Sequence, residues 1–158
     1  MRVNILLDDP KGVRADWFNA DPFAPDDDPH GRTRCSPAPH GDDPGLARFV
    51  GAAEALEVSA REVLDAWDLS SVPAVLSHWA GRLRRGGLLF VSFHDARSVA
   101  RRLLADEMSL EEANGVLHGR RRSSLTWRHV NDLLRGMGLD TARAGNEGTL
   151  AWMEMKRK

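Results

Sequence analysis

The sequence predicts an α/β fold with a mainly parallel sheet, helices on both faces and an antiparallel hairpin strand at the end. Continuous apolar runs of strand length, VNILL and LLFVSF, are typical of parallel strands buried on both faces. Predicted strands alternate with helices, which favours a parallel sheet with crossover helices. Two final strands around the turn at residues 144–148 form the closing hairpin.

Composition indicates an ordinary globular chain. The 158 residues, 42% hydrophobic and 28% charged, fit one domain spanning 1–158. A net charge of −1 gives no indication of a nucleic-acid partner or an anionic membrane surface. Cys35 is the only cysteine, and neither a signal peptide nor a membrane-length apolar run is seen, so we expect a cytoplasmic protein.

The first half of the chain has two predicted strands separated by a long loop. VNILL, residues 3–7, is the first strand, and residues 53–59 form the next. Between them, residues 22–45 hold six of the eight prolines and five aspartates, with at most a short edge strand around Arg34. A loop of this length favours a functional or disordered segment. Residues 46–50 are predicted to form a short helix or turn.

A helix over residues 72–84 has clear start and stop signals. Ser70 or Ser71 can cap it, Pro73 suits its first turn, and Gly86-Gly87 follows its end. Apolar residues at three- and four-residue spacing predict one buried face: Val72, Val75, Leu76, Trp79 and Leu83. The strand at residues 88–93 comes next.

The remaining chain predicts three helices and the hairpin. One helix begins near His94, a capping box at Ser109–Glu112 starts another, and Thr126 caps a third that Gly138 closes. DTARAG and TLAWMEMK are the two final strands. We therefore expect residues 3–7, 53–59 and 88–93 to be parallel, with 149–155 antiparallel to them.

Several motifs resemble the class I S-adenosylmethionine-dependent methyltransferases. VLSHWAGRLRRGGLLFVSFHD, residues 75–95, is similar to their "helix, L-K-P-G-G, strand" signature, and VLDA at 63–66 is similar to their "vLeH" segment with Ala66 in place of histidine. MSLEEANGVLHG and the helix after it resemble a stretch of small methyltransferases, and DWFNADPF resembles their "gwinvD" segment. The resemblance implies a Rossmann-like class I methyltransferase sheet, S-adenosylmethionine as cofactor and methyl transfer as activity.

The sequence departs from that family at the turn after the first strand. The family has a glycine turn there, because the backbone passes close to the cofactor and takes positive φ. Here the strand runs into Asp8-Asp9-Pro10-Lys11-Gly12. Two hypotheses follow: a methyltransferase-like protein with reduced or lost cofactor binding, or a catalytically inactive methyltransferase-fold module for binding or assembly. A phosphate-binding G-x-x-x-x-G-K-[ST] motif is absent, which disfavours other nucleotides.

The resemblance implies a set of cofactor-binding candidates, each with a plainer alternative. Asp21 falls at the acidic residue that holds the ribose, although it could simply open the turn at Pro22. Asp8 and Asp9, after the first strand, could face the methionine ammonium of the cofactor or simply end the strand. Asp42 and Asp43, in HGDDPG, could lie near the adenine or form a loop tip. The full set is Asp8, Asp9, Gly12, Asp21, Asp42, Asp43, Ser59 and Ala60.

Catalytic candidates follow the strands. His94 and Asp95 come directly after the strongest strand, where ligands of open α/β sheets bind, and His94 could act as a general base. Arg61 could hold a substrate anion or be an ordinary surface residue. Trp67 follows the segment that shapes the substrate pocket in the family. The sequence does not identify the substrate, which could be a small molecule or a macromolecule, and it leaves a protein partner open.

Two further clusters have weaker signals. His30, Cys35 and His40 match no zinc-binding spacing, so no metal site is expected. Cys35 also has no feature of a nucleophile. The basic run Arg120–Arg122 could contact phosphate or mark a phosphorylation site, or it could be a solvated loop.

Overall fold

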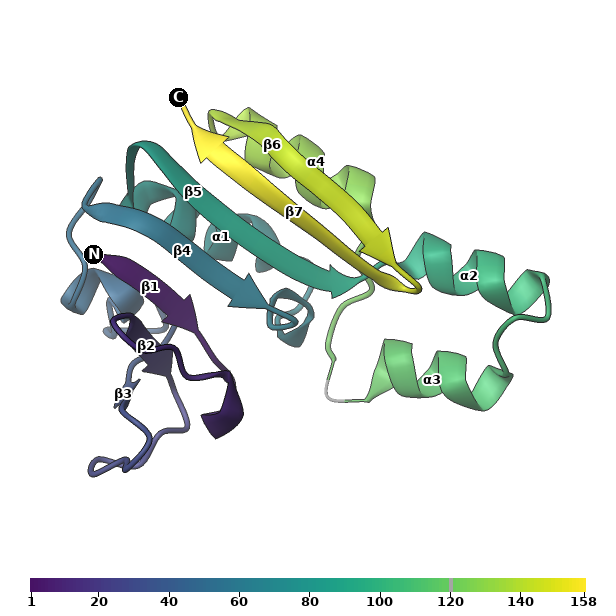
Figure 1. Cartoon of the computed structure of the whole chain (residues 1–158), viewed down its shortest axis with the longest axis horizontal. Helices are drawn as coiled ribbons and strands as arrows, with labels where there is room; N and C mark the ends of the chain where they lie inside the picture. Colours follow the sequence, from purple (N-terminus) through teal and green to yellow (C-terminus); the bar gives the residue numbers. More distant parts are fainter. Residues whose placement is uncertain (120) are drawn as a thin grey trace.

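A seven-stranded sheet with the order β3-β2-β1-β4-β5-β7-β6 forms the centre of the structure (Figure 1). The computed structural model describes residues 1–119 and 121–158. The strands are β1 (Arg2–Ile5), β2 (Phe18–Asp21), β3 (Arg32–Arg34), β4 (Ala55–Arg61), β5 (Leu83–His94), β6 (Leu139–Glu147) and β7 (Leu150–Arg157).

The strand directions confirm the predicted topology. Four neighbouring pairs are parallel, namely β1 with β2, β1 with β4, β2 with β3, and β4 with β5. β7 runs antiparallel to β5, and β6 antiparallel to β7. The expected edge strand around Arg34 is β3, and the segment ending at Asp21 is β2. The prolines and aspartates of the 22–45 loop therefore surround a strand of the sheet.

Several boundaries differ from the sequence prediction, and β4, for example, spans residues 55–61 where 53–59 were expected. β1 ends at Ile5, two residues early, and the chain reverses at Asp8 with φ of 53°. The helix predicted over 72–84 ends at Arg82, and β5 already begins at Leu83, so Gly86-Gly87 lies within the strand. A Cβ on Gly87 would lie 2.9 Å from the Arg84 carbonyl oxygen, which explains why only glycine fits beside the β4 bulge.

The helices have the caps that the sequence predicts. Ser109 and Glu112 form the capping box, and Thr126 accepts a bond from the His129 N–H. Ser71 occupies the cap position of its helix without a side-chain bond. The α-helices are α1 (Val72–Arg82), α2 (Ala96–Leu104), α3 (Leu110–His118) and α4 (Trp127–Gly136). Short 3₁₀ helices are η1 (Pro10–Gly12), η2 (Gly45–Arg48) and η3 (Leu64–Ala66).

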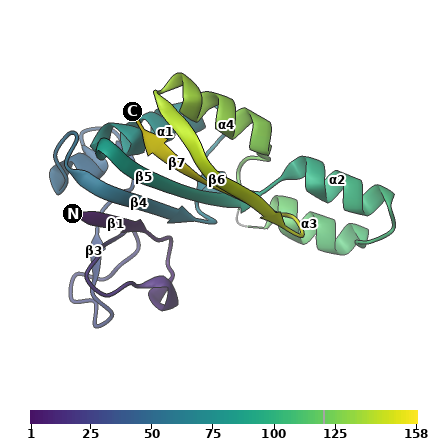
Figure 2. The ribbon, with the colours of Figure 1, turned by 45° about the horizontal axis from the view of Figure 1, so that its top comes forward.

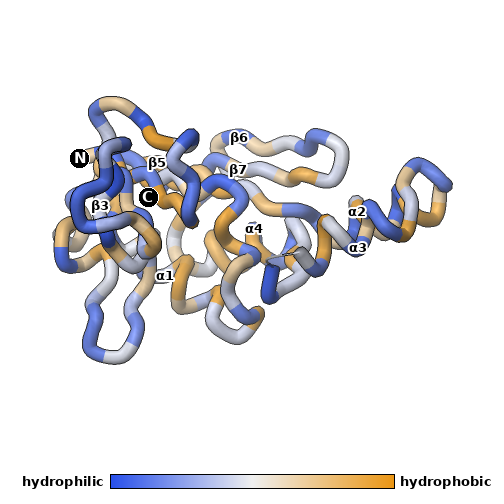
Figure 3. The backbone as a smooth tube through the Cα atoms, turned by 90° about the horizontal axis from the view of Figure 1, so that it is seen from below, coloured by the Kyte–Doolittle hydropathy of each residue, from blue (hydrophilic) through white to orange (hydrophobic). Residues whose placement is uncertain are grey.

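The core lies between one face of the sheet and the pair α1 and α4 (Figure 2). Val75, Leu76 and Trp79 are buried on α1, as their spacing predicts. η1 lies on the opposite face, where the Asn4 side chain donates to the Gly12 carbonyl at 2.9 Å. α2 and α3 form a hairpin that extends away from the sheet (Figure 3). Among the described residues, no helix combines the length and apolarity needed to span a membrane.

Candidate functional site

The largest candidate site is a cavity of about 810 Å³ at the carboxyl ends of β1, β2, β3 and β4. Open α/β sheets bind ligands at this edge of the sheet. Each of the four strands supplies lining residues directly after it ends, and the segment around the end of α3 closes the other side. The lining side chains include Asp8, Phe23, Ser36, Glu62, Asp65, Trp67, Arg121 and Arg122.

Asp8 follows β1 by three residues and Glu62 follows β4 directly, and both have a φ of 53°. Side chains other than glycine adopt this left-handed region at a cost, and such strain concentrates at functional sites. The Glu62 N–H donates to the Ser92 carbonyl at 2.9 Å, which fixes the strained turn. Asp8 thus takes the backbone conformation that we expected to require glycine, and its side chain stays 58% exposed at the cavity.

Asp21, the predicted ribose acceptor, is fully buried at the end of β2. Its Oδ1 accepts the backbone N–H of Asp8 at 3.1 Å and that of Phe23 at 2.9 Å. Its Oδ2 accepts a bond from Arg32 Nη1 at 3.0 Å. Both carboxylate oxygens are therefore occupied by groups of the chain itself.

Arg32 on β3 is the partner that sequence analysis missed. Its side chain is only 7% exposed, and it also donates to Asp28 through Nε at 3.1 Å and Nη2 at 2.9 Å. These bonds hold the pKa of Asp28 at about 2, below its ordinary 3.8. The four-residue spacing of Asp28 and Arg32 is visible in the sequence, but the contact with Asp21 depends on the pairing of β2 with β3.

Asp65 and Arg121 form a second ion pair at the cavity. Asp65 is buried, and its Oδ2 accepts a bond from Arg121 Nε at 2.7 Å. Burial raises the pKa of Asp65, and the Arg121 cation opposes that rise. Of the predicted basic run, Arg120 lies outside the described residues, Arg122 is exposed, and Arg121 is held by Asp65 instead of being solvated.

The catalytic candidates separate into different environments. The Asp95 carboxylate is buried and accepts bonds from Ser98 at the start of α2 and from the Trp127 N–H, so it serves to cap helices. Arg61 lies with its guanidinium 4.4 Å from the centre of the Phe90 ring. His94 is closest to the cavity, because its Nε2 lies 3.7 Å from Glu62 Oε2 while its Nδ1 lies 2.9 Å from Thr149 Oγ1.

We predict that His94 titrates below pH 6.5. Burial lowers its pKa first, the Arg121 cation lowers it further, and Glu62 partly opposes both. Arg121→Gln should raise the His94 pKa, because it removes the positive charge that lowers it. NMR titration of the imidazole protons measures this, with Arg122→Gln as the control of equal charge change. A midpoint above 6.5 in the unmodified chain, or no response to Arg121→Gln, contradicts the prediction.

The other predicted cofactor residues lie away from the lining of this cavity. Asp9 accepts the Lys11 N–H at 3.0 Å and starts η1, and Gly12 lies in the same turn. Asp42 is exposed, and Asp43 lies in a smaller neighbouring pocket with Cys35. Ser59 and Ala60 are fully buried within β4, and the Ser59 hydroxyl has no partner among the described residues.

His30, Cys35 and His40 do not gather into a common group among the described residues. Within residues 1–119 and 121–158, no three His, Cys, Asp or Glu side chains gather as a metal site. Cys35 is buried, and burial raises the pKa of its thiol to about 11. A thiol with such a pKa stays protonated at neutral pH and is a poor nucleophile.

Comparison with solved structures identifies the fold. No model of a known protein family matches the chain, and no curated protein matches it. One similar structure is an O-methyltransferase family protein from Burkholderia thailandensis. The alignment covers 72% of this chain and 33% of the Burkholderia chain, with a TM-score of 0.53 and 22% sequence identity. An S-adenosylmethionine-dependent methyltransferase from Thermotoga maritima is also similar. The alignment covers 70% of this chain and 59% of the Thermotoga chain, with a TM-score of 0.51 and 14% sequence identity.

The chain has the class I methyltransferase-like fold. It spans between a third and three fifths of the length of these two solved chains. At these identities the similarity establishes the fold alone.

Proposed function

We propose that the chain is a methyltransferase-like domain that binds S-adenosylmethionine in the cavity at the ends of β1 to β4, with reduced affinity. The observation that carries the proposal is the strained pair Asp8 and Glu62, which turn the ends of two parallel strands toward one cavity. Strain of this kind persists where the surrounding structure holds it, and it clusters at binding sites.

The donor set of the cavity fits the charged end of this cofactor. Asp8 and Glu62 supply carboxylates for an ammonium and a sulfonium, and Arg122 supplies a cation for the methionine carboxylate. A cavity with both signs of charge suits a zwitterionic amino-acid group better than it suits a polyphosphate. Phe23, 64% exposed, and Trp67 provide aromatic faces for the adenine ring.

The ribose is the part of the cofactor that this site holds poorly. Asp21 is fully buried, and Arg32 and two backbone N–H groups take three of its acceptor positions, so ribose hydroxyls do not reach it in this arrangement. A charged acceptor typically contributes about 1.5–3 kcal/mol per hydrogen bond, so its loss explains weak binding.

When bound, S-adenosylmethionine supplies an electrophilic methyl group, and the protein's contribution is mainly to position a nucleophile in line with it. His94 is neutral above its lowered pKa, and its Nε2 lies 3.7 Å from Glu62 Oε2, a side chain that lines the cavity. A neutral imidazole there can accept the proton that an acceptor hydroxyl or amine releases. With Nδ1–H donating to the Thr149 hydroxyl at 2.9 Å, Nε2 keeps the free lone pair that accepts the proton, and Glu62 Oε2 at 3.7 Å stabilises the imidazolium that forms.

The alternative function is a catalytically inactive methyltransferase-fold module for binding or assembly, that is, a pseudoenzyme. The closed Asp21–Arg32 pair favours it, because the ribose acceptor has become part of the structural core. The two functions differ in one measurable property, which is whether the cavity binds the cofactor at all.

Calorimetry with S-adenosylmethionine and S-adenosylhomocysteine tests the proposal. We expect a dissociation constant on the order of 0.1–1 mM, weaker than the micromolar range. Asp8→Asn and Glu62→Gln should each weaken binding by roughly five- to tenfold, because each removes a charged acceptor. Asp42→Asn is the control, since it changes the same charge at an exposed position outside the cavity. Absence of binding at millimolar cofactor would establish the inactive module instead.

A further inference from the structure

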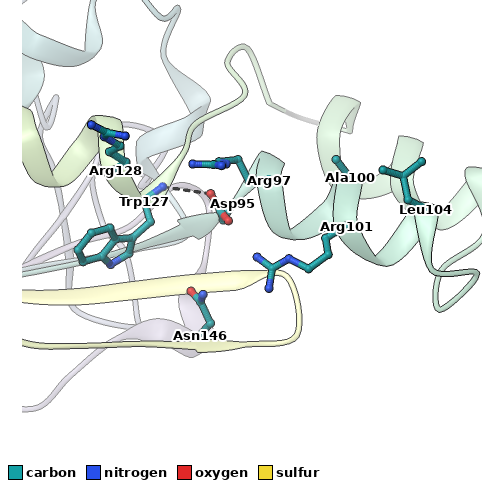
Figure 4. A pocket seen from close by; sticks show the side chains of 8 residues that line it. All are labelled: Asp95, Arg97, Ala100, Arg101, Leu104, Trp127, Arg128 and Asn146. Carbon is teal, nitrogen blue, oxygen red and sulfur yellow. Dashed lines mark hydrogen bonds between the residues drawn. The ribbon is translucent and has the colours of Figure 1, made fainter.

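A second hollow lies on the other side of the carboxyl end of β5, between α2, the start of α4 and the β6–β7 hairpin (Figure 4). Its volume is about 550 Å³, within the range of small-molecule sites. We call it the arginine groove. Its lining residues are Asp95, Arg97, Ala100, Arg101, Leu104, Trp127, Arg128 and Asn146.

Two arginines of this groove, Arg97 and Arg101, form no ion pair among the described residues. Arg97 and Arg101 are one helical turn apart on α2, and their guanidinium groups point toward Asp95 and Asn146 (Figure 4). Within the described residues, neither has a carboxylate within 4.0 Å. The Asp95 carboxylate is buried in its capping bonds. Arg128 at the rim pairs only loosely, at 3.9 Å, with exposed Asp132.

The groove also offers an apolar surface beside the cations. Trp127 is partly exposed at the first position of α4, and Leu104, 87% exposed, continues the apolar lining along α2. An aromatic platform next to arginines is the arrangement that binds a nucleobase by stacking and its phosphates by charge. An inorganic anion would use the arginines and leave the aromatic and aliphatic surface unused.

We propose that the arginine groove binds a nucleoside phosphate, with the base against Trp127 and the phosphates on Arg97 and Arg101. Arginine suits phosphate because its planar guanidinium can donate two parallel hydrogen bonds. The Asn146 side chain on the hairpin is placed to contact the polar edge of a base or a sugar hydroxyl. The ligand is either a free nucleotide or the end of a single strand, since both present this chemistry.

The groove and the cofactor cavity adjoin the same strand end. Asp95 lines the groove, and the preceding residue His94 contacts Glu62, which lines the cavity. Nucleotide binding is independent of the proposed function, whereas a role of the nucleotide as methyl acceptor rests on it.

Calorimetry with ADP, a single-stranded decanucleotide, adenosine and inorganic pyrophosphate, each without cofactor, tests this proposal. We expect ADP and the oligonucleotide to bind more tightly than either adenosine or pyrophosphate, and tighter binding of the oligonucleotide would identify a strand as the ligand. The double variant Arg97→Gln/Arg101→Gln should weaken ADP binding at least tenfold. Arg84→Gln/Arg85→Gln is the control, because it changes the same charge at exposed positions at the opposite end of β5.

Variants of Trp127 separate base recognition from charge. Trp127→Leu should weaken ADP binding roughly tenfold and leave pyrophosphate binding unchanged, while Trp127→Phe keeps an aromatic face and most of the affinity. The proposal is overturned if pyrophosphate binds as tightly as ADP, if neither nucleotide ligand binds, or if the control variant weakens ADP binding equally. Nucleotide binding without cofactor binding would refute the proposed function and leave this inference standing.

Discussion

Trp79→Ala should lower the free energy of unfolding by about 3–5 kcal/mol, the range for deleting a large aromatic side chain from a packed core. Trp79 is fully buried on α1 and packs edge-to-face against Trp67 at a centroid distance of 5.7 Å. Its Nε1–H donates to the Pro37 carbonyl at 2.8 Å, so the same side chain joins the helix to the proline-rich segment. Urea denaturation followed by circular dichroism measures the change.

Two further variants separate the causes of this loss. Trp79→Phe keeps most of the packing but leaves the Pro37 carbonyl without its donor, so we expect a smaller cost of about 1–3 kcal/mol. Leu104→Ala removes a side chain that is 87% exposed and should change stability by less than about 0.5 kcal/mol. A Trp79→Ala cost below about 1 kcal/mol would contradict the core position of α1.

The sequence predicted the elements whose periodicity and caps are local. The apolar spacing on α1 placed Val75, Leu76 and Trp79 in the core, and the Ser109–Glu112 capping box is present as predicted. Local signals were less reliable at the end of α1. Gly86-Gly87 is typical of a helix stop, but its position within β5 follows from close approach to β4.

The candidate site was predictable only where it depends on strand ends. Asp8 and Trp67 follow predicted strands, and both line the cavity. The positive φ of Asp8 contradicts the inference that only glycine can make this turn, because aspartate tolerates the left-handed region better than most residues. The arginine groove joins α2, α4 and the hairpin, and the near-neutral net charge of the chain gave no sign of its local positive charge.

The engagement of Asp21 by Arg32 could not be predicted from spacing, because several aspartates of the 22–45 loop compete for the same arginine. The structure pairs Arg32 with Asp28, Asp21 and, at 3.8 Å, Asp8, whereas exposed Asp26 pairs with Arg34. An acidic residue at the end of β2 indicates a ribose acceptor only while its oxygens are free. Here Asp21 is buried and paired with Arg32, so the sequence motif alone predicts a higher cofactor affinity than we expect from the structure.

Arg32→Ala should increase the affinity for S-adenosylmethionine by on the order of tenfold, because it frees Asp21 Oδ2 for a ribose hydroxyl as a charged acceptor. The variant should also be less stable, since Asp21 and Asp28 lose their shared cation. Calorimetry gives the affinity, and thermal melts with and without cofactor show whether the variant is folded. Arg34→Ala, on the same strand with an exposed partner, should leave both properties unchanged.

A double-mutant cycle shows whether Asp21 is the group that Arg32 withholds. Asp21→Asn should have little effect on cofactor binding while Arg32 is present, because the carboxylate is then inaccessible. In the Arg32→Ala background the same change should remove the gain in affinity, which is a coupling that independent sites do not show. If Arg32→Ala is folded and binds no better than the unmodified chain, or if its gain survives Asp21→Asn, the pair does not control the ribose site.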